Sequence, residues 1–245
     1  MNYELMIETF PKLLVGLNIT IQLVTISLFV GFCFAIGLAL LRLSNNLFLN
    51  FFAKTYIFYF RGTPLLVQIF LIYYGIAQFE FIRESFVWSF FKEAYWCAIL
   101  ALTLNTCAYS SEIIRGGIQS VSFGQIESAK STGMSGFLLY RRIILPIAFR
   151  QALPAYGNEI ILMVKATSLV STITIMDVTG IARLIIAKTF SPVEIFIVAG
   201  LIYLIINFIV TRLVNYSEIK CFLSTHLNHY AFLALSEILI KKKIK

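Results

Sequence analysis

The sequence predicts an all-α membrane protein with about five transmembrane helices. Apolar residues make up 59% of the 245 positions, charged residues only 13%, and the mean hydropathy is +0.86. A soluble domain carries about 45–50% apolar and about 25% charged residues, so the bilayer is the expected solvent. A helix needs about 20 mostly apolar residues to cross a membrane. Five stretches fit this requirement: residues 13–41, 56–79, 94–113, 151–175 and 194–216.

The distribution of basic residues predicts the orientation of these spans. Cytoplasmic segments are enriched in Lys and Arg. Most of the 20 Lys and Arg residues follow the first span, lie between the third and fourth spans or follow the fifth span. The residues on the opposite side are Lys12, Arg83, Lys92, Arg183 and Lys188. We therefore expect the N-terminus outside and the C-terminus in the cytoplasm.

Several classes of function are disfavoured by what the chain lacks. The net charge of +8 lies mostly beside spans, where orientation and anionic membrane lipid explain it, so nucleic-acid binding is not expected. The four cysteines have no Cys-x-x-Cys spacing, and His226 and His229 have no acidic or thiolate cluster beside them, so no metal site is predicted. No Gly-x-x-x-x-Gly-Lys-Ser/Thr loop occurs, so the chain itself should hydrolyse no ATP and bind no cofactor.

The first two spans contain a packing signal and a break. Gly31, Ala35 and Ala39 are spaced four residues apart, which predicts close approach of another helix. The run Arg61-Gly62-Thr63-Pro64 interrupts the second span, and Thr63 is predicted to cap a helix that starts at Pro64. Two interpretations stay open: a cap at the membrane surface, or a broken helix that lines a transport pathway.

The polar segment of residues 115–150 separates the third and fourth spans and should form two short helices. Ser122 and Gln125 have the spacing of a capping box, so the first helix should run from Phe123 to about Thr132 and end at Gly133. Ser135 can cap a second helix, which should end before Pro146. Without a long apolar face, this pair needs support from a partner or from the base of the bundle.

The spacing in this segment resembles the cytoplasmic signature of the integral membrane permease subunits of ATP-binding-cassette (ABC) importers. That signature is Glu-Ala-Ala, three residues, Gly, nine residues, Ile, one residue and Leu-Pro. This chain has Glu127-Ser128-Ala129, Gly133, Ile143 and Leu145-Pro146 at the same intervals. The one departure is Ser128 in place of Ala, which exchanges one small side chain for another.

Three further segments resemble permeases of arginine and of histidine, lysine and ornithine importers: Arg61–Tyr74, Ala101–Tyr109 and Ala152–Glu159. The resemblance covers about residues 10–225 and is greatest to the M-type subunit. It implies the type I ABC importer permease fold in the bacterial inner membrane, with a transmembrane domain over residues 1–216, a coupling loop at 115–150 and a tail at 217–245. The implied partners are a Q-type permease or a second copy of this chain, a periplasmic amino-acid-binding protein, and an ABC ATPase dimer that binds ATP and Mg²⁺.

The same resemblance implies that the coupling loop sits in a cleft of the ATPase. Closure of the ATPase on ATP would then move the spans as rigid bodies. The alternative is a loop that merely folds against the bundle. The implied contact or hinge residues are Glu127, Ser128, Ala129, Gly133, Arg141, Arg142, Ile143, Leu145 and Pro146.

The fourth span carries the polar residues of interest. Gln151, Asn158, Lys165 and Thr172 recur every seven residues and share a helical stripe, and Glu159 lies about 100° around the helix from Asn158. A charge near the bilayer centre costs at least about 2.5–3.5 kcal/mol, so such residues should face protein or water. Asn158, Glu159 and Lys165 are therefore candidate substrate-pathway residues. Two roles stay open for Glu159: a counter-charge for a substrate cation, or a hydrogen-bond anchor for another helix or subunit.

Two segments follow the fourth span and the fifth. Residues 174–180 open an outside segment long enough for a short surface helix, with Asp177 favourable near its N-terminus. The resemblance implies that the binding protein docks on this face. In the tail, residues 227–240 are apolar but too short to span and are followed by lysines, which predicts an interfacial helix.

The expected function is permeation of polar, basic amino acids (arginine, histidine, lysine or ornithine) from periplasm to cytoplasm by alternating access. A separate ATPase would supply the energy. One alternative is an importer subunit for glutamine or another polar amino acid. A passive channel or a membrane-embedded enzyme are alternatives of another class. An enzyme would require paired acids, a His cluster or a nucleophile with its base, and none is evident.

Overall fold

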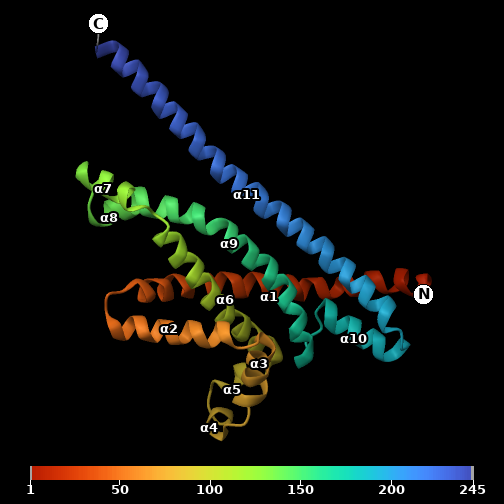
Figure 1. The fold of residues 1–245 in the computed structure, drawn as a ribbon. Helices are drawn as coiled ribbons and strands as arrows, with labels where there is room; N and C mark the ends of the chain where they lie inside the picture. Colours follow the sequence, from red (N-terminus) through yellow and green to blue (C-terminus); the bar gives the residue numbers. More distant parts are fainter. Residues whose placement is uncertain (1, 244–245) are drawn as a thin grey trace.

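The computed structural model describes the backbone of residues 2–243 and the side chains of residues 2–220. All regular elements in this part of the chain are helical (Figure 1). The longer helices are α1 (Tyr3–Leu43), α2 (Leu47–Gly62), α6 (Ala94–Gln119), α9 (Leu145–Ala166) and α11 (Pro192–Lys243). The shorter ones are α3 (Leu65–Phe70), the π-helical η1 (Leu71–Gly75), α4 (Glu80–Arg83), α5 (Trp88–Phe91), α7 (Phe123–Ser131), α8 (Gly136–Leu139), the π-helical η2 (Tyr140–Ile144), the 3₁₀-helical η3 (Thr167–Ile173) and α10 (Val178–Thr189).

The part of the chain that the structure describes contains three to five segments that could span a membrane. Helices α1 and α6 and the Pro192–Lys220 part of α11 are each long and apolar enough to cross a membrane. Two bent pairs qualify if each counts as one span: Leu47–Gly62 with Leu65–Gly75, bent by 104°, and Gly136–Ile173 with Val178–Thr189, bent by 46°. The number predicted from the sequence, about five, therefore equals the upper limit of this range. The predicted interruption of the second span is confirmed, because the chain turns sharply after Gly62, but this segment starts at Leu47 and not at the predicted residue 56.

Helices α1 and α6 pack closely at the centre of the molecule. The predicted small-residue stripe is confirmed, because Ala35 and Ala39 are fully buried and a Cβ on Gly31 would lie 2.3 Å from Cγ2 of Thr106. A core of buried apolar side chains joins these helices to α3, α9 and η3; among its members are Leu23, Ile69, Leu102, Met163 and Val170. The core thus fixes the break after α2 against α6 and α9.

Thr63 does not cap α3 as predicted. Its hydroxyl instead donates to the carbonyl of Tyr59, at 2.8 Å, in the preceding turn of α2. Pro64 occupies the N-cap position, and α3 begins at Leu65 without a side-chain cap. The helix does restart at this break, as the sequence indicates, but another residue supports it.

The break is held by Gln68, whose side chain is 2% exposed. Its Nε2 atom donates to the carbonyl of Phe60 at 2.9 Å and to the carbonyl and hydroxyl of Thr63 at 3.0 and 2.8 Å. Asn105 of α6 donates to Oε1 of Gln68 at 3.0 Å and to the carbonyl of Phe60 at 3.2 Å. Backbone groups freed by a helix break are thus paired inside the protein, as membrane depth requires.

Helices α1, α10 and α11 meet at a second tightly packed corner, at the end of the molecule where the N-terminus lies (Figure 1). The predicted helix after the fourth span is α10, and buried Asp177 caps it by accepting from the N–H of Gly180 at 2.8 Å. The Tyr203 hydroxyl of α11 donates to the other carboxylate oxygen of Asp177 at 3.0 Å. Gly16 of α1 faces the Asp177 backbone, and an added Cβ would lie 2.6 Å from its carbonyl carbon.

The last helix continues past the predicted domain boundary. Helix α11 runs without interruption across position 216, so the division between 1–216 and 217–245 coincides with no helix end. The predicted interfacial contacts of residues 227–240, and the pair His226 and His229, involve side chains outside the described residues.

Gly16→Ala should lower the free energy of unfolding by about 1–3 kcal/mol, because the new methyl group meets backbone atoms that cannot move aside. Thermal unfolding of the detergent-purified protein measures this effect. Gly37→Ala is the matched control in the same helix, because no atom lies within 4 Å of its added Cβ. Equal melting temperatures for the two variants would contradict the close contact between α1 and α10.

Gln68→Leu should also lower the melting temperature, because it removes the hydrogen bonds of Gln68 to Phe60, Thr63 and Asn105, each worth about 0.5–1.5 kcal/mol. Leucine preserves much of the volume, so the loss reports hydrogen bonds more than packing. The control is Gln78→Leu, at an exposed position beyond η1. A Gln68→Leu protein as stable as this control would show that the break does not depend on Gln68.

Candidate substrate pathway and coupling loop

Glu159 of α9 is buried, with 6% of its surface exposed, and faces α6. Its Oε1 atom accepts a hydrogen bond from the Thr106 hydroxyl at 3.0 Å, which is the only hydrogen bond to this carboxylate among the described residues. The side chain also lines a cavity of about 170 Å³ together with Asn105, Tyr109 and Met163. One carboxylate therefore combines an interhelical contact with access to a small polar cavity.

The other two predicted pathway residues of α9 do not join Glu159 in this cavity. Asn158 and Lys165 are exposed on the chain, and Gln151 of the same stripe is also exposed. The stripe thus forms an open polar face of α9. In the part of the chain whose side chains are described, Lys165 forms no salt bridge.

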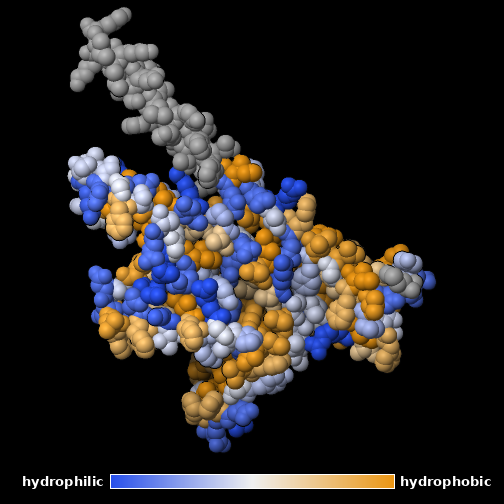
Figure 2. All heavy atoms as spheres, viewed as in Figure 1, coloured by the Kyte–Doolittle hydropathy of each residue, from blue (hydrophilic) through white to orange (hydrophobic). Residues whose placement is uncertain are grey.

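A second polar cavity, of about 420 Å³, lies between the ends of α1, α2 and α6. Arg61 at the break lines this cavity, and its guanidinium carbon lies 5.0 Å from the centroid of the Tyr109 ring. Glu112 lines the cavity too, and its carboxylate accepts two hydrogen bonds from the Arg115 guanidinium, at 2.9 and 2.7 Å. Nε of Arg42 forms a salt bridge with the same carboxylate at 3.8 Å. Figure 2 shows hydrophilic residues gathered over the region where α2 and α6 run side by side.

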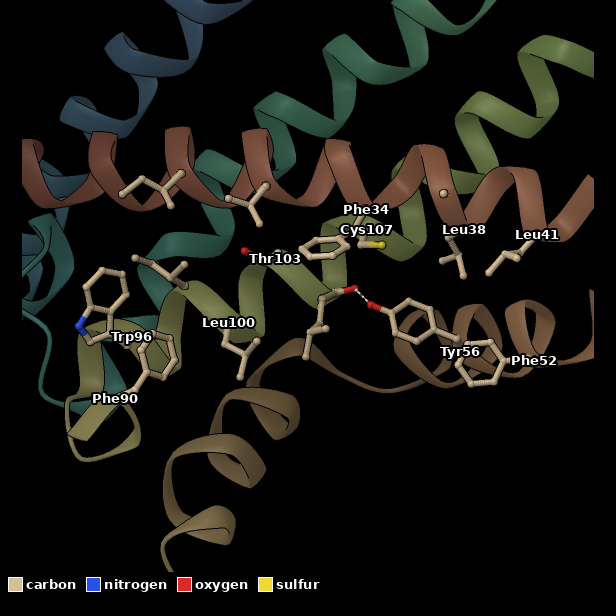
Figure 3. Close-up of a pocket in the computed structure, with 15 residues that line it drawn as sticks. Phe34, Leu38, Leu41, Phe52, Tyr56, Phe90, Trp96, Leu100, Thr103 and Cys107 are labelled. Carbon is tan, nitrogen blue, oxygen red and sulfur yellow. Dashed lines mark hydrogen bonds between the residues drawn. The ribbon is translucent and has the colours of Figure 1, made fainter. Parts of the chain in front are cut away.

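A larger cavity of about 630 Å³ lies between α1, α2, α5 and α6 (Figure 3). Aromatic and aliphatic side chains dominate its lining, including Phe34, Trp96 and Leu100. The Tyr56 hydroxyl that faces it already donates to the carbonyl of Leu104 at 2.8 Å. Because no charged residue lines this cavity, it offers no partner for an ionic solute.

The first helix of the coupling loop forms as predicted. Helix α7 spans Phe123–Ser131, and its capping box joins Ser122 and Gln125. Gly133 adopts the left-handed conformation, with φ of +84°. The N–H of Gly133 donates to the carbonyl of Lys130 at 2.9 Å and that of Met134 to Ala129 at 3.1 Å, which is the hydrogen-bond pattern of a Schellman motif.

The predicted end of the second helix before Pro146 is wrong. Helices α8, η2 and α9 form one helical run from Gly136 to Ala166. The π-helical turn before Pro146 explains this continuity, because Leu145 donates to the carbonyl of Tyr140, five residues back. Pro146 directly follows this wide turn, so the helical run continues past a residue that has no N–H to donate.

The coupling loop has a small apolar core of its own. Ala129, Leu139 and Ile144 are buried in it, and Ile118 of α6 and Ile147 of α9 pack against them. The loop pair is thus supported by the ends of α6 and α9, which is the support by the bundle base that the sequence requires.

The predicted contact residues of the loop fall into two groups. Ala129 is buried and Ile143 and Pro146 are half-buried, so they shape the loop from within. No salt bridge among the described residues involves the charged members. The exposed members are Glu127, Ser128, Gly133, Arg141, Arg142 and Leu145.

The sequence did not single out the α6 side chains that complete the site. Three such residues lie within four positions of one another on α6. Thr106 contacts Glu159 of α9, Asn105 contacts Gln68 at the helix break, and Tyr109 contacts Arg61. Polar residues recurring inside an apolar span were the available signal. Among the described residues, no group of three or more His, Cys, Asp or Glu side chains is arranged to hold a metal ion.

Solved ABC importers share this fold. The crystal structure of an amino acid ABC transporter with histidines aligns with a TM-score of 0.81 and 34% identity, over 90% of this chain and 99% of that chain. An inward-facing MetNI methionine ABC transporter aligns with a TM-score of 0.71 and 17% identity, over 85% and 96%, which supports the fold alone. The predicted all-α ABC importer permease fold is confirmed.

Curated relatives agree with the resemblance seen in the sequence. The nopaline transport system permease protein NocM of Agrobacterium fabrum is 59% identical over 219 residues, covering 89% of this chain and 91% of the relative. The octopine permease protein OccM of Rhizobium meliloti is 57% identical over 206 residues, or 84% of each chain. The histidine/lysine/arginine/ornithine permease protein HisM of Escherichia coli is 44% identical over 204 residues, covering 83% and 86%.

The family model described as binding-protein-dependent transport system inner membrane component matches residues 27–220. The matched region includes the broken second segment, the coupling loop and the Glu159 cavity. The chain therefore belongs to the family of binding-protein-dependent transport system inner membrane components.

Proposed function

We propose that this chain is the permease subunit of an ABC importer that carries basic amino acids and arginine-derived solutes into the cytoplasm by alternating access. The observation that carries this proposal is the position of Glu159. Its carboxylate faces a polar cavity from the same helical run, Gly136–Ala166, that begins in the exposed coupling loop. One continuous helix thus connects a cation-attracting cavity with a surface suited to an energy-supplying partner.

The chemistry of the cavity favours a cationic solute. Glu159 supplies a negative charge away from bulk water, where it acts more strongly than at a surface. Asn105 and the ring of Tyr109 line the same cavity and can orient a guanidinium or ammonium group. Relatives are named for nopaline, octopine and histidine, lysine, arginine and ornithine. Nopaline and octopine are arginine derivatives, so all these solutes carry a cationic side chain or the imidazole of histidine.

The exposed side of the coupling loop is suited to docking a soluble ATPase. Phe123 and Phe137 are 84% and 78% exposed there, and Glu127, Arg141 and Arg142 are exposed beside them. Large exposed apolar groups among charged residues are typical of a protein interface. In this proposal an ABC ATPase dimer binds ATP and Mg²⁺, and the loop transmits its closure to α6 and α9.

A second permease subunit is needed to cover the open polar face of α9. Gln151, Asn158 and Lys165 would otherwise meet lipid, which is unfavourable at membrane depth. A Q-type sister permease, as in the M-type systems that this chain resembles, would enclose the pathway, and a second copy of the chain could do the same. We further propose that the N-terminus and α10 face the periplasm of a bacterial inner membrane, where the amino-acid-binding protein docks.

Reconstitution tests the proposal directly. Liposomes containing this chain, its sister permease and the ATPase, supplied with the binding protein, should take up labelled arginine only with ATP inside. Competition by lysine, histidine, ornithine, nopaline, octopine and glutamine would rank the cargo. Uptake without ATP would identify a channel, and preference for glutamine over every basic solute would reject the cationic cargo.

Glu127→Lys should lower ATP-driven uptake at least about tenfold. The reason is the loss of a charged contact at the docked loop, which costs about 1.4 kcal/mol or more. Co-purification with the ATPase measures docking, and uptake in proteoliposomes measures coupling. Glu218→Lys on α11 is the control, because it makes the same charge change outside the loop. Normal uptake by Glu127→Lys would remove Glu127 from the coupling interface.

Glu159→Gln should lower arginine uptake roughly tenfold to a hundredfold, since a hydrogen bond to a charged group is worth about 1.5–3 kcal/mol. The glutamine carbonyl can still accept from Thr106, so the amount of assembled complex should stay near that of the wild type. Size-exclusion chromatography measures assembly beside the uptake assay. Equal loss of assembly and uptake would identify Glu159 as an anchor and not as a substrate counter-charge.

A further inference from the structure

The two polar cavities share one wall, the ring of Tyr109. The smaller cavity contains Glu159 and Asn105, and the larger contains Arg61 and Glu112; Tyr109 lines both. Tyr109 projects from α6 one turn beyond Asn105, toward the end of α6 that leads into the coupling loop. A solute that moves from the Glu159 cavity to the Arg61 cavity therefore passes beside this ring.

A cation of the protein itself already occupies the ring. The guanidinium of Arg61 lies 5.0 Å from the ring centroid, within the range of a cation–π contact. No carboxylate among the described residues lies within salt-bridge distance of Arg61, although Glu112 lines the same cavity. Arg115 and Arg42 occupy Glu112 instead. The ring is thus the partner in direct contact with the Arg61 guanidinium, whereas the carboxylates of the described residues lie beyond salt-bridge distance.

The backbone beside Arg61 is held by several hydrogen bonds, whereas its side chain is held by fewer contacts. Gln68 and Asn105 tie the carbonyl of Phe60, the residue before Arg61, to α3 and α6. The Arg61 side chain is exposed and held by a single cation–π contact, which is weaker at such a site than a desolvated ion pair. Arg61 can therefore leave the ring without disturbing the break.

We propose that Arg61 is a stand-in cation that closes the pathway at Tyr109 until a cationic substrate displaces it. The substrate guanidinium or ammonium group takes the position over the ring that Arg61 holds in the empty permease, because two cations cannot share it. A neutral solute gains little by this exchange, so the pair also selects for charge. This inference rests on the proposed transport of basic solutes and assigns Arg61 and Tyr109 as specificity-determining residues.

Passive efflux tests the proposal in the full complex. Proteoliposomes are loaded with labelled arginine or with citrulline, its neutral analogue of nearly equal shape, and efflux is followed without ATP. Arg61→Gln should raise arginine efflux about two- to fivefold, the change expected for losing an exposed cation–π contact. Tyr109→Leu should raise it similarly, Tyr109→Phe should stay as tight as the wild type, and Arg61→Gln combined with Tyr109→Leu should leak no more than either change alone.

The matched control is Arg212→Gln. Arg212 of α11 also stacks on a ring, with its guanidinium carbon 5.1 Å from the centroid of Phe208, but it lines neither polar cavity. Arginine efflux through this variant should equal that of the wild type. Size-exclusion chromatography of each complex confirms assembly before efflux is compared.

Four outcomes decide the proposal. Arginine efflux that rises more than citrulline efflux in Arg61→Gln and in Tyr109→Leu supports it. Equal leakage of both solutes would mean a general opening of the structure and overturns it. If Arg61→Gln vesicles leak no more than wild-type vesicles while the complex still imports arginine with ATP, the gate is overturned and the proposed function stands. A wild-type complex that imports no basic solute overturns both.

Discussion

The pairing of polar groups inside an apolar helix bundle is the constraint on which the rest of this structure depends. Helix α6 supplies both decisive partners: Asn105 binds Gln68 at the broken second segment, and Thr106 binds Glu159 of α9. Without these bonds, a helix break and a carboxylate would both be unsatisfied among buried apolar side chains. The same bonds fix α3 and α9 on two sides of α6, and so they set the width and the lining of the Glu159 cavity.

Close backbone contacts make the rest of the bundle stiff enough to transmit a displacement. An added Cβ on Gly117 of α6 would lie 2.6 Å from the carbonyl oxygen of Ala148 in α9, next to the coupling loop. At the other end of the molecule, Gly16 of α1 packs against the backbone of Asp177, where α1 and α10 meet. Figure 1 shows α7 and α8 at one end of the molecule and α10 at the other. Packed helices with such contacts can move as rigid bodies, and in the proposed coupling a force on the loop would reach α10 through α9 and η3.

The success of the sequence interpretation depended on how local each signal is. Ser122 and Gly133 act on neighbours within a few residues, so capping chemistry predicted α7 correctly. The prediction that Thr63 caps α3 was wrong, because its hydroxyl instead donates to the carbonyl of Tyr59 in the preceding turn. The role of Gln68 could not be predicted, since its partner Asn105 lies 37 residues away and only the fold brings them together. The same applies to Glu159 and Thr106, which are 53 residues apart.

The order of charges along the pathway suits release as well as capture. In the proposed pathway, a cation that leaves Glu159 would meet Tyr109 and then the cavity of Glu112, where Arg115 and Arg42 already surround the carboxylate. A free carboxylate at that position would hold the solute a second time. Transport requires binding strong enough to admit the solute and weak enough to let it leave. Occupation of Tyr109 and Glu112 by the protein's own arginines leaves Glu159 as the one strong acidic site of the proposed pathway among the described residues. In this proposal the solute is captured once and released toward the coupling-loop end.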